Sequence, residues 1–237
     1  MRRRAFLTLS VAVAYTACGL WLDRGVGPAG QLLLGLMTAG VLTALLMFHS
    51  RATRVQTLAV VGVATLGEVV GSLIWGVYTY RLDNLPAFVP PGHGLVYLSG
   101  LSLATLLAHR ENVLLAAAIA GAVLWGALGM SALMATDVSG AIGCAFLVVV
   151  LLKTRRAVYA GVFLVVGALE IYGTAIGTWT WEGVVPGLGI TQGNPPSGAA
   201  SGYVVFDVVA LWLTARLTGT TLRGIRARVQ QALATGV

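Results

Sequence analysis

The chain has 237 residues, of which 57% are hydrophobic and only 10% are charged. Soluble globular domains carry roughly 25% charged residues, so this composition excludes an ordinary soluble domain. The apolar residues form blocks long enough to cross a bilayer, which predicts a polytopic membrane protein. The net charge of +7 rests on 15 basic and 8 acidic residues, and we attribute it to basic loops on one side of the membrane and not to nucleic-acid binding.

Eight transmembrane helices are predicted in chain order, and together they form a single all-α integral membrane domain, residues 1–237. Each approaches the roughly 20 residues that cross about 30 Å of hydrocarbon. Glycine, proline and basic residues separate the helices. We place them at residues 5–22, 29–49, 55–80, 91–108, 112–134, 137–152, 157–180 and 198–215. The first has the basic start of a secretory signal, but its removal would leave an odd number of spans, so we expect it to be retained.

Basic residues predict the orientation, because cytoplasmic loops of membrane proteins retain Lys and Arg. With the N terminus inside, only Arg24 and Arg81 lie on the outer side. The cytoplasmic side collects Arg2, Arg3, Arg4, Arg51, Arg54, Arg110, Lys153, Arg155, Arg156, Arg216, Arg223, Arg226 and Arg228. We therefore expect a multi-pass protein of the cell membrane with both termini in the cytoplasm. Its basic tail, residues 216–237, is expected to lie along the anionic inner surface.

The sequence contains an internal repeat. Arg54 precedes Glu68 by fourteen residues, and Arg156 precedes Glu170 by the same interval. Further matching segments are 68–72 with 170–174, 78–80 with 179–181 after a one-residue slip, and 90–92 with 195–197. Acids, aromatics and proline pairs are rare within membrane spans, so we interpret the match as a duplication.

Each unit of the predicted duplication contains four helices, the first at about residues 5–108 and the second at about residues 112–215. An even number of helices gives both copies the same orientation. The repeat is therefore predicted to be parallel, about an axis along the membrane normal.

Three acids fall within the predicted spans: Glu68, Glu170 and Asp207. A rise of 1.5 Å per residue puts each glutamate roughly 21 Å from its cytoplasmic arginine, and Asp207 about 13 Å from Arg216. An ionised acid at a span centre costs on the order of 2.5–3.5 kcal/mol. Because no Lys or Arg lies at matching depth, we expect neutral carboxyls that can donate protons. The alternative is that these acids are hydrogen-bonded and merely hold helices together.

Side chains near the acids complete the predicted site. Ser72 and Thr174 follow the two glutamates by one helical turn and are expected to hold the carboxyls in position. The aromatic side chains expected to line a substrate pocket are Trp75, Tyr78, Tyr97, Trp179 and Tyr203. Ring faces of this kind stabilise a developing carbocation. Tyr80 and Trp181 are expected in the aromatic belt at the membrane surface.

Metal, cofactor and nucleophile motifs are missing from the sequence. There is no GxSxG, P-loop, HExxH or dinucleotide fingerprint. His93 has no Cys or His at ligand spacing, so we expect it to have a structural role in a loop. Cys18 and Cys144 lie within apolar segments and form no disulfide framework. We expect no metal and no cofactor.

The stretch from Glu68 to Pro90 supports a family resemblance. Glu68-x-x-Gly71, Gly76-x-Tyr78-x-Tyr80, Pro86 and Val89-Pro90 resemble the carotenoid hydratases of the bisanhydrobacterioruberin hydratase type. The resemblance covers about 25 residues of this sequence. Those membrane proteins add water across a terminal isoprenoid double bond.

The layout of the acids is similar to a second family, the small membrane-bound terpene cyclases. These have an acid on an early helix and an aspartate on the last, where Glu68 and Asp207 fall in this chain. Both resemblances imply that a buried carboxylic acid protonates an alkene or epoxide, and that water or an internal alkene captures the cation.

We therefore expect an intramembrane acid catalyst, of the lyase or isomerase type, that acts on an isoprenoid or carotenoid lipid. Glu68 would donate the proton, with Asp207 or Glu170 as its partner. The partners expected are membrane lipids and an apolar substrate, and no nucleic acid. A proton-coupled transporter is the chief alternative, since paired acids at mid-depth also suit alternating access. A non-catalytic membrane subunit is a further alternative.

Overall fold

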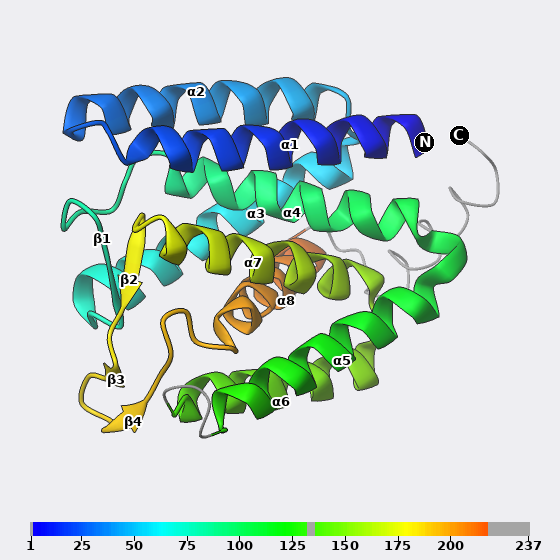
Figure 1. The fold of residues 1–237 in the computed structure, drawn as a ribbon. Coiled ribbons are helices and arrows are strands. Elements are labelled where there is room, and N and C mark those ends of the chain that lie inside the picture. Colours follow the sequence, from blue (N-terminus) through cyan, green and yellow to red (C-terminus); the bar gives the residue numbers. More distant parts are fainter. Residues whose placement is uncertain (1, 132–135, 218–237) are drawn as a thin grey trace.

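A computed structural model of the protein describes residues 2–131 and 136–217 (Figure 1). These residues contain eight α-helices: α1 (Arg2–Asp23), α2 (Pro28–Met47), α3 (Arg51–Glu68), α4 (Val89–Leu106), α5 (Glu111–Gly129), α6 (Val138–Thr154), α7 (Ala157–Ala175) and α8 (Ala199–Leu217). A π-helix, η1 (Val69–Ile74), continues α3, and a 3-10 turn, η2 (Ala108–Arg110), precedes α5. Residues 218–237 of the predicted basic tail, and the last residues of the fifth predicted span, lie outside the described residues.

Six helical segments are long and apolar enough to cross a membrane. They are residues 2–23, 28–47, 51–74, 108–129, 157–175 and 199–216. The all-α class is thus confirmed, and membrane association is supported, whereas the count of eight spans remains a prediction. Two of the predicted spans, which correspond to α4 and α6, are not among these six segments. α6 is a shorter apolar helix, and α4 carries buried polar residues such as His93 and Ser99 that face neighbouring helices.

The third and seventh predicted spans are too long at their C-terminal ends. We predicted helix as far as residues 80 and 180, but the helical segments end at Ile74 and Ala175. Gly76 and Gly177 follow with φ of +71° and +75°, in the left-handed region that ends a helix and that glycine adopts most easily.

Short strands replace the predicted helix ends. β1 (Tyr78–Tyr80) and β2 (Trp179–Trp181) pair antiparallel, with Thr79 opposite Thr180. Thr79 and Thr180 are also the middle residues of the two segments that match in the sequence repeat, so the strands pair the two copies about this position. A second hairpin, β3 (Val184–Val185) with β4 (Ile190–Thr191), lies in the connection to α8.

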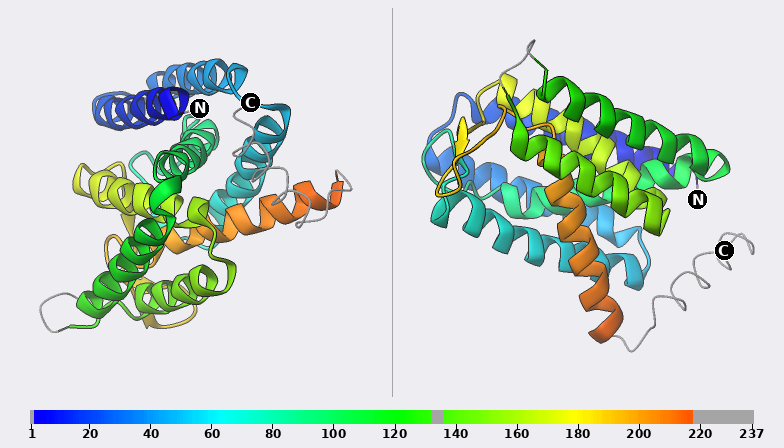
Figure 2. Two further views of the ribbon diagram at one scale, coloured as in Figure 1. Left: turned by 90° about the vertical axis from the view of Figure 1, so that its right-hand side faces the viewer. Right: turned by 90° about the horizontal axis from the view of Figure 1, so that it is seen from below.

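Helices α3, α4, α7 and α8 pack against one another at the centre of the bundle. The α1–α2 pair packs against α4 on one side, and the α5–α6 pair packs against α7 and α8 on the other (Figures 1 and 2). Small residues allow the central contact between α4 and α7. A Cβ added at Gly100 or at Gly161 would collide with backbone of the opposite helix, so glycine is required for this close approach.

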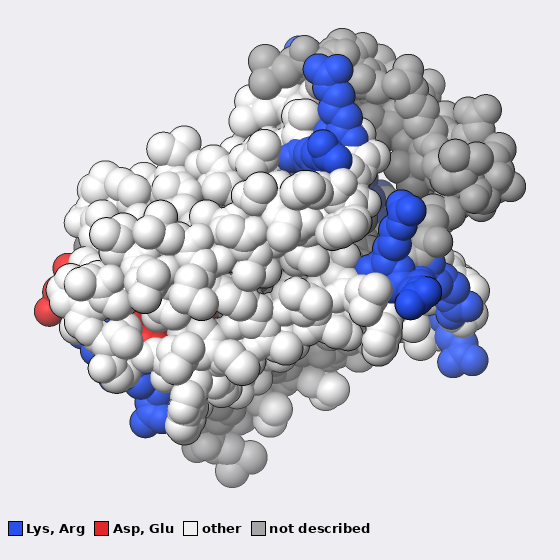
Figure 3. All heavy atoms as spheres, turned by 90° about the horizontal axis from the view of Figure 1, so that it is seen from above, with Lys and Arg blue, Asp and Glu red and all other residues white. Residues whose placement is uncertain are grey.

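Charged side chains gather at the ends of the bundle (Figure 3). Lys and Arg side chains cover the end near the N terminus, and the visible Asp and Glu side chains lie at the opposite end, where some basic side chains also lie. The faces between the ends are largely uncharged in this view. Exposed leucines, such as Leu36 and Leu66, occupy the sides of the helices. A lipid-embedded bundle has this distribution, because charge is expensive in hydrocarbon.

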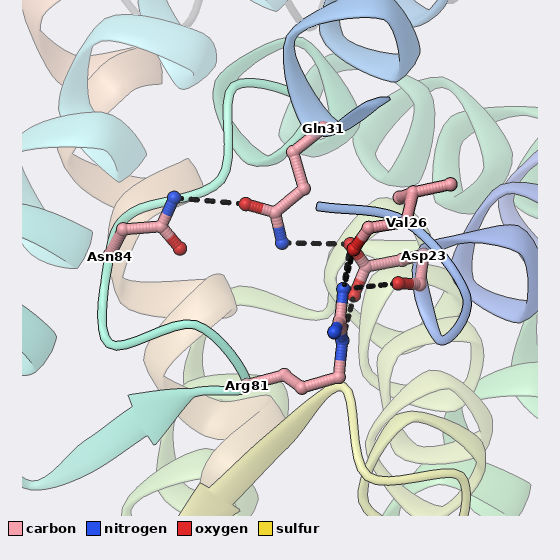
Figure 4. Close-up of polar contacts among 5 residues, drawn as sticks. All are labelled: Asp23, Val26, Gln31, Arg81 and Asn84. Carbon is pink, nitrogen blue, oxygen red and sulfur yellow. Dashed lines mark hydrogen bonds and ion pairs between the residues drawn. The ribbon is translucent and has the colours of Figure 1, made fainter. Parts of the chain in front are cut away.

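A polar network joins α1, α2 and the segment after β1 at the end opposite the N terminus (Figure 4). Asp23 is fully buried, and its carboxylate accepts hydrogen bonds from Gln31, at 2.8 Å, and from Nε of Arg81, at 3.4 Å. Asn84 donates to Gln31 at 2.9 Å, and Arg81 also donates to the carbonyl of Val26 at 2.6 Å. The network fixes the β1–α4 connection, and therefore the position of β1, against the first two helices.

Candidate active site

Glu68, the last residue of α3, lies inside the bundle with 3% of its surface exposed. Tyr78 and Tyr80 of β1 donate their hydroxyls to its Oε2, at 2.6 and 2.7 Å. His93 of α4 places Nε2 2.9 Å from Oε1. These partners come from β1 and α4, so the chain reversal after η1 brings them to the acid.

Glu170 of α7 is equally buried, at 2% exposure, and it is bound by indoles. Trp179 and Trp181 of β2 donate Nε1–H to its Oε2, at 3.0 and 3.2 Å. Tyr203 of α8 also interacts with this carboxyl. Within the described ranges no Lys, Arg or His side chain hydrogen-bonds to Glu170. Among the described residues, Glu68 therefore has a partner that can carry a positive charge, His93, and Glu170 has none.

The turns after the two acids make corresponding hydrogen bonds. The N–H of Val77 donates to the carbonyl of Gly71, and the N–H of Thr178 donates to the carbonyl of Gly173, each at 2.9 Å. The first bond spans one residue more than the second. The extra residue lies in η1, because the wider turn of a π-helix accommodates an insertion. This insertion explains the one-residue slip between the two matching sequence segments.

A cavity of about 180 Å³ lies between the two glutamates. It is lined by Gly67, Glu68, Gly71, Trp75, Val77, Tyr78, Tyr80, Glu170, Trp179, Trp181, Ala199, Gly202, Tyr203 and Phe206. Both acids and seven aromatic side chains therefore line the same cavity. A smaller cavity of about 50 Å³ lies on the α1 side and is lined in part by His93, Tyr80 and Trp179.

The phenols of Tyr78 and Tyr80 lie beyond the candidate span that ends at Ile74. Burial raises the pKa of both phenols, and the adjacent Glu68 carboxyl raises it further. Both side chains are therefore protonated hydrogen-bond donors at neutral pH, and they hold the carboxyl without exchanging a proton with it.

Four of the five aromatic residues predicted for a pocket line this cavity. Trp75 is half-exposed at its rim and donates Nε1–H to the carbonyl of Pro186, at 2.8 Å. Tyr97 does not line the cavity. It is buried in the main hydrophobic core, with its hydroxyl 3.5 Å from Oε1 of Gln56.

Asp207 does not share the cavity of the two glutamates. It is 2% exposed, and its Oδ2 has no hydrogen-bond partner among the described residues. Asp207 follows Tyr203, a cavity residue, by four positions in α8, so it lies about 6 Å deeper along that helix. Its electrostatic neighbours are Tyr97 and Tyr159. The structure therefore does not bring Asp207 together with Glu68 at this cavity.

In the part of the chain that the structure describes, neither Ser72 nor Thr174 hydrogen-bonds to a glutamate carboxyl. Thr174 donates to the backbone carbonyl of Glu170 at 2.7 Å, and Ser72 is buried in η1. The aromatic side chains of the strands bind the carboxyls in their place. Gly71 and Gly173 make room for this: the Tyr78 ring packs against the first, and the Trp179 ring occupies the space that a Cβ on the second would need.

Sequence reasoning missed the roles of His93, Tyr80 and Trp181. His93 lies in the first turns of α4 and not in a loop, and Tyr80 and Trp181 bind the acids instead of forming a surface belt. The alternation Tyr-x-Tyr and Trp-x-Trp was an available signal, because side chains two apart in a strand point to the same side.

No protein-family model matches the sequence, and no curated protein or solved structure matches it either. The geometry of the cavity therefore carries the functional argument by itself.

Proposed function

We propose that this chain is an intramembrane enzyme, of the lyase or isomerase type, that protonates an alkene of an isoprenoid or carotenoid lipid. The observation that carries the proposal is the pair of buried glutamates on one aromatic cavity, of which only one contacts a histidine. The two carboxyls can therefore hold different charges and take opposite roles, as acid and as base.

Glu170 is the proton donor in this proposal, in place of Glu68. Indole N–H groups can hydrogen-bond to a neutral carboxyl, and Glu170 has no cationic neighbour among the described residues. Glu68 accepts hydrogen bonds from two hydroxyls and lies 2.9 Å from Nε2 of His93, so it has three partners that stabilise a carboxylate. The Glu68–His93 pair is therefore the base.

The reaction begins when the O–H bond of Glu170 breaks and a C–H bond forms at the less substituted alkene carbon. The tertiary carbocation that results lies among the faces of Tyr78, Trp179 and Trp181, where cation–π attraction stabilises it. Water captures the cation through its oxygen and then loses a proton, or an internal alkene captures it and the cyclised cation then loses a proton from carbon. The proton that is released goes to the Glu68–His93 pair, and its return to Glu170 completes the cycle.

The membrane arrangement is part of the proposal. We propose eight spans in two parallel four-helix repeats, with both termini on the cytoplasmic side. The basic residues at one end of the bundle support the orientation. The matching turns after Glu68 and Glu170, and the pairing of Thr79 with Thr180, support the repeat. The peripheral helix pairs pack differently in the two halves, so the proposed symmetry is limited to the central four helices.

Deuterium uptake tests the chemistry even while the product is unidentified. Purified protein in liposomes with mixed prenyl lipids is incubated in D2O, and the recovered lipids are analysed by mass spectrometry. Protonation, hydration and cyclisation all place deuterium on carbon. We expect incorporation in the wild type and none in Glu170→Gln, while the exposed-acid control Glu182→Gln retains it.

Two results would overturn the proposal. Unchanged deuterium uptake in Glu170→Gln would exclude this residue as the donor. Proton movement driven by a solute, with no label on any lipid, would indicate a transporter.

A further inference from the structure

Two stripes of residues face each other across the rim of the cavity. Gly67 of α3, Gly71 of η1 and Trp75, which follows η1, recur at intervals of four residues, and Ala199, Gly202 and Phe206 recur along α8. All six are partly or largely exposed, whereas Glu68, Glu170, Tyr80 and Trp179 are buried. The rim is thus a slot between two helices, and the acids lie at its floor.

The surface beside this slot is apolar. Leu66, Val70 and Ile74 on the α3 side are 69%, 50% and 74% exposed, and Val205 and Val209 on α8 are 36% and 38% exposed. These side chains lie within two candidate membrane spans. Their exposure indicates contact with lipid, so the slot opens toward the hydrocarbon of the bilayer.

The size of the cavity limits what can enter. An apolar cavity of about 150 Å³ in a protein core binds one benzene molecule, with six carbon atoms. The cavity here, at about 180 Å³, accommodates a group of similar size and not a whole long-chain lipid. A long apolar chain must therefore leave most of its length outside the slot.

The Phe206 ring of α8 lies against Gly67 of α3, where it lines the cavity. A Cβ added at Gly67 would overlap the far end of the Phe206 ring, so this ring lies directly over the glycine. The ring is also 6.1 Å from the imidazole of His93, between centroids.

We propose that the slot between α3 and α8 is a lateral portal, gated by Phe206 over Gly67, which admits one end group of a long apolar lipid while the rest of the molecule stays in the bilayer. This inference rests on the proposed function and names the part of the substrate that the site receives. The enzyme would then recognise the terminus of its substrate and be indifferent to its length.

Photolabelling tests the portal independently of catalysis. Two long isoprenoid hydrocarbons are added to liposomes that contain the full chain, one with a diazirine at its terminus and one with a diazirine at mid-chain. Labelled residues are identified by peptide mass spectrometry after illumination. We expect the terminal probe to label Trp75 and Phe206, and the mid-chain probe to label exposed residues such as Ile74 and Val209.

Substitutions at the gate sharpen this test. Gly67→Val puts its side chain in the space that the end of the Phe206 ring occupies, and we expect a loss of about tenfold in cavity labelling because the added side chain and the displaced ring overfill the slot. Gly62→Val is the matched control, since Gly62 lies in the same helix with open space around it. Gly202→Leu fills the slot from α8 and gives a second variant if Gly67→Val fails to fold.

The outcomes separate the portal from the chemistry. Equal labelling of the cavity by both probes, or unchanged labelling in both the Gly67 and Gly202 variants, would overturn the portal. Terminal labelling of the cavity with no deuterium uptake would keep the portal and refute the proposed reaction. Deuterium uptake with no cavity labelling would support the proposed reaction and refute the portal.

Discussion

The Glu68–His93 contact is the most direct place to test the charge assignment. The two side chains are 4% and 3% exposed, and the Oε1–Nε2 distance is 2.9 Å, so water does not screen their interaction. Replacing His93 with Leu would leave Glu68 buried with only its two phenol partners. Removal of one partner from a buried ion pair costs about 3–5 kcal/mol, and we expect His93→Leu to lose that amount of unfolding free energy.

A double-mutant cycle isolates the charge from the lost packing. Glu68→Gln in the His93→Leu background removes the uncompensated carboxylate, so the double variant should be more stable than His93→Leu alone by about 2 kcal/mol or more. Unfolding of the four proteins is followed in mixed micelles by tryptophan fluorescence. Additive losses, with no recovery in the double variant, would show that the pair is neutral and would refute Glu68–His93 as the base.

Three further predictions concern the surrounding structure. Gly177→Ala should lose about 1–2 kcal/mol of unfolding free energy, because the residue has φ of +75°, whereas the exposed control Gly183→Ala should lose little. Arg81→Met should lose about 1–3 kcal/mol of unfolding free energy, since Asp23 is fully buried and loses its cationic partner (Figure 4). A loss no larger than that of a surface substitution would contradict a stabilising role for the Arg81–Asp23 contact. The raised pKa of Tyr80 predicts stability that is complete below about pH 10 and falls above it, where the unfolded phenol ionises first. Thermal unfolding in alkaline buffer should show a smaller loss for Tyr80→Phe, and an equal loss would contradict the assignment.

Most of the helical architecture follows from local sequence. Apolar blocks bounded by basic clusters and prolines indicated all eight helices, because helix formation in an apolar environment depends on length and hydropathy within one segment. The predicted bounds fail where tertiary contacts decide. At Gly76 and Gly177 the backbone reverses and the next residues pair as strands, so aromatic residues that extend an apolar pattern do not extend the helix.

The candidate site was only partly predictable, because tertiary contacts decide which groups surround the acids. The sequence by itself identified Glu68 and Glu170 and their repeated surroundings, because acids in apolar spans are conspicuous wherever the helices lie. Only the tertiary structure decided which groups meet them: His93 reaches Glu68 from another helix, and Asp207 lies outside the cavity. Hydropathy describes each segment alone, whereas the charge of a buried carboxyl depends on partners that the packing of distant segments brings within hydrogen-bond distance.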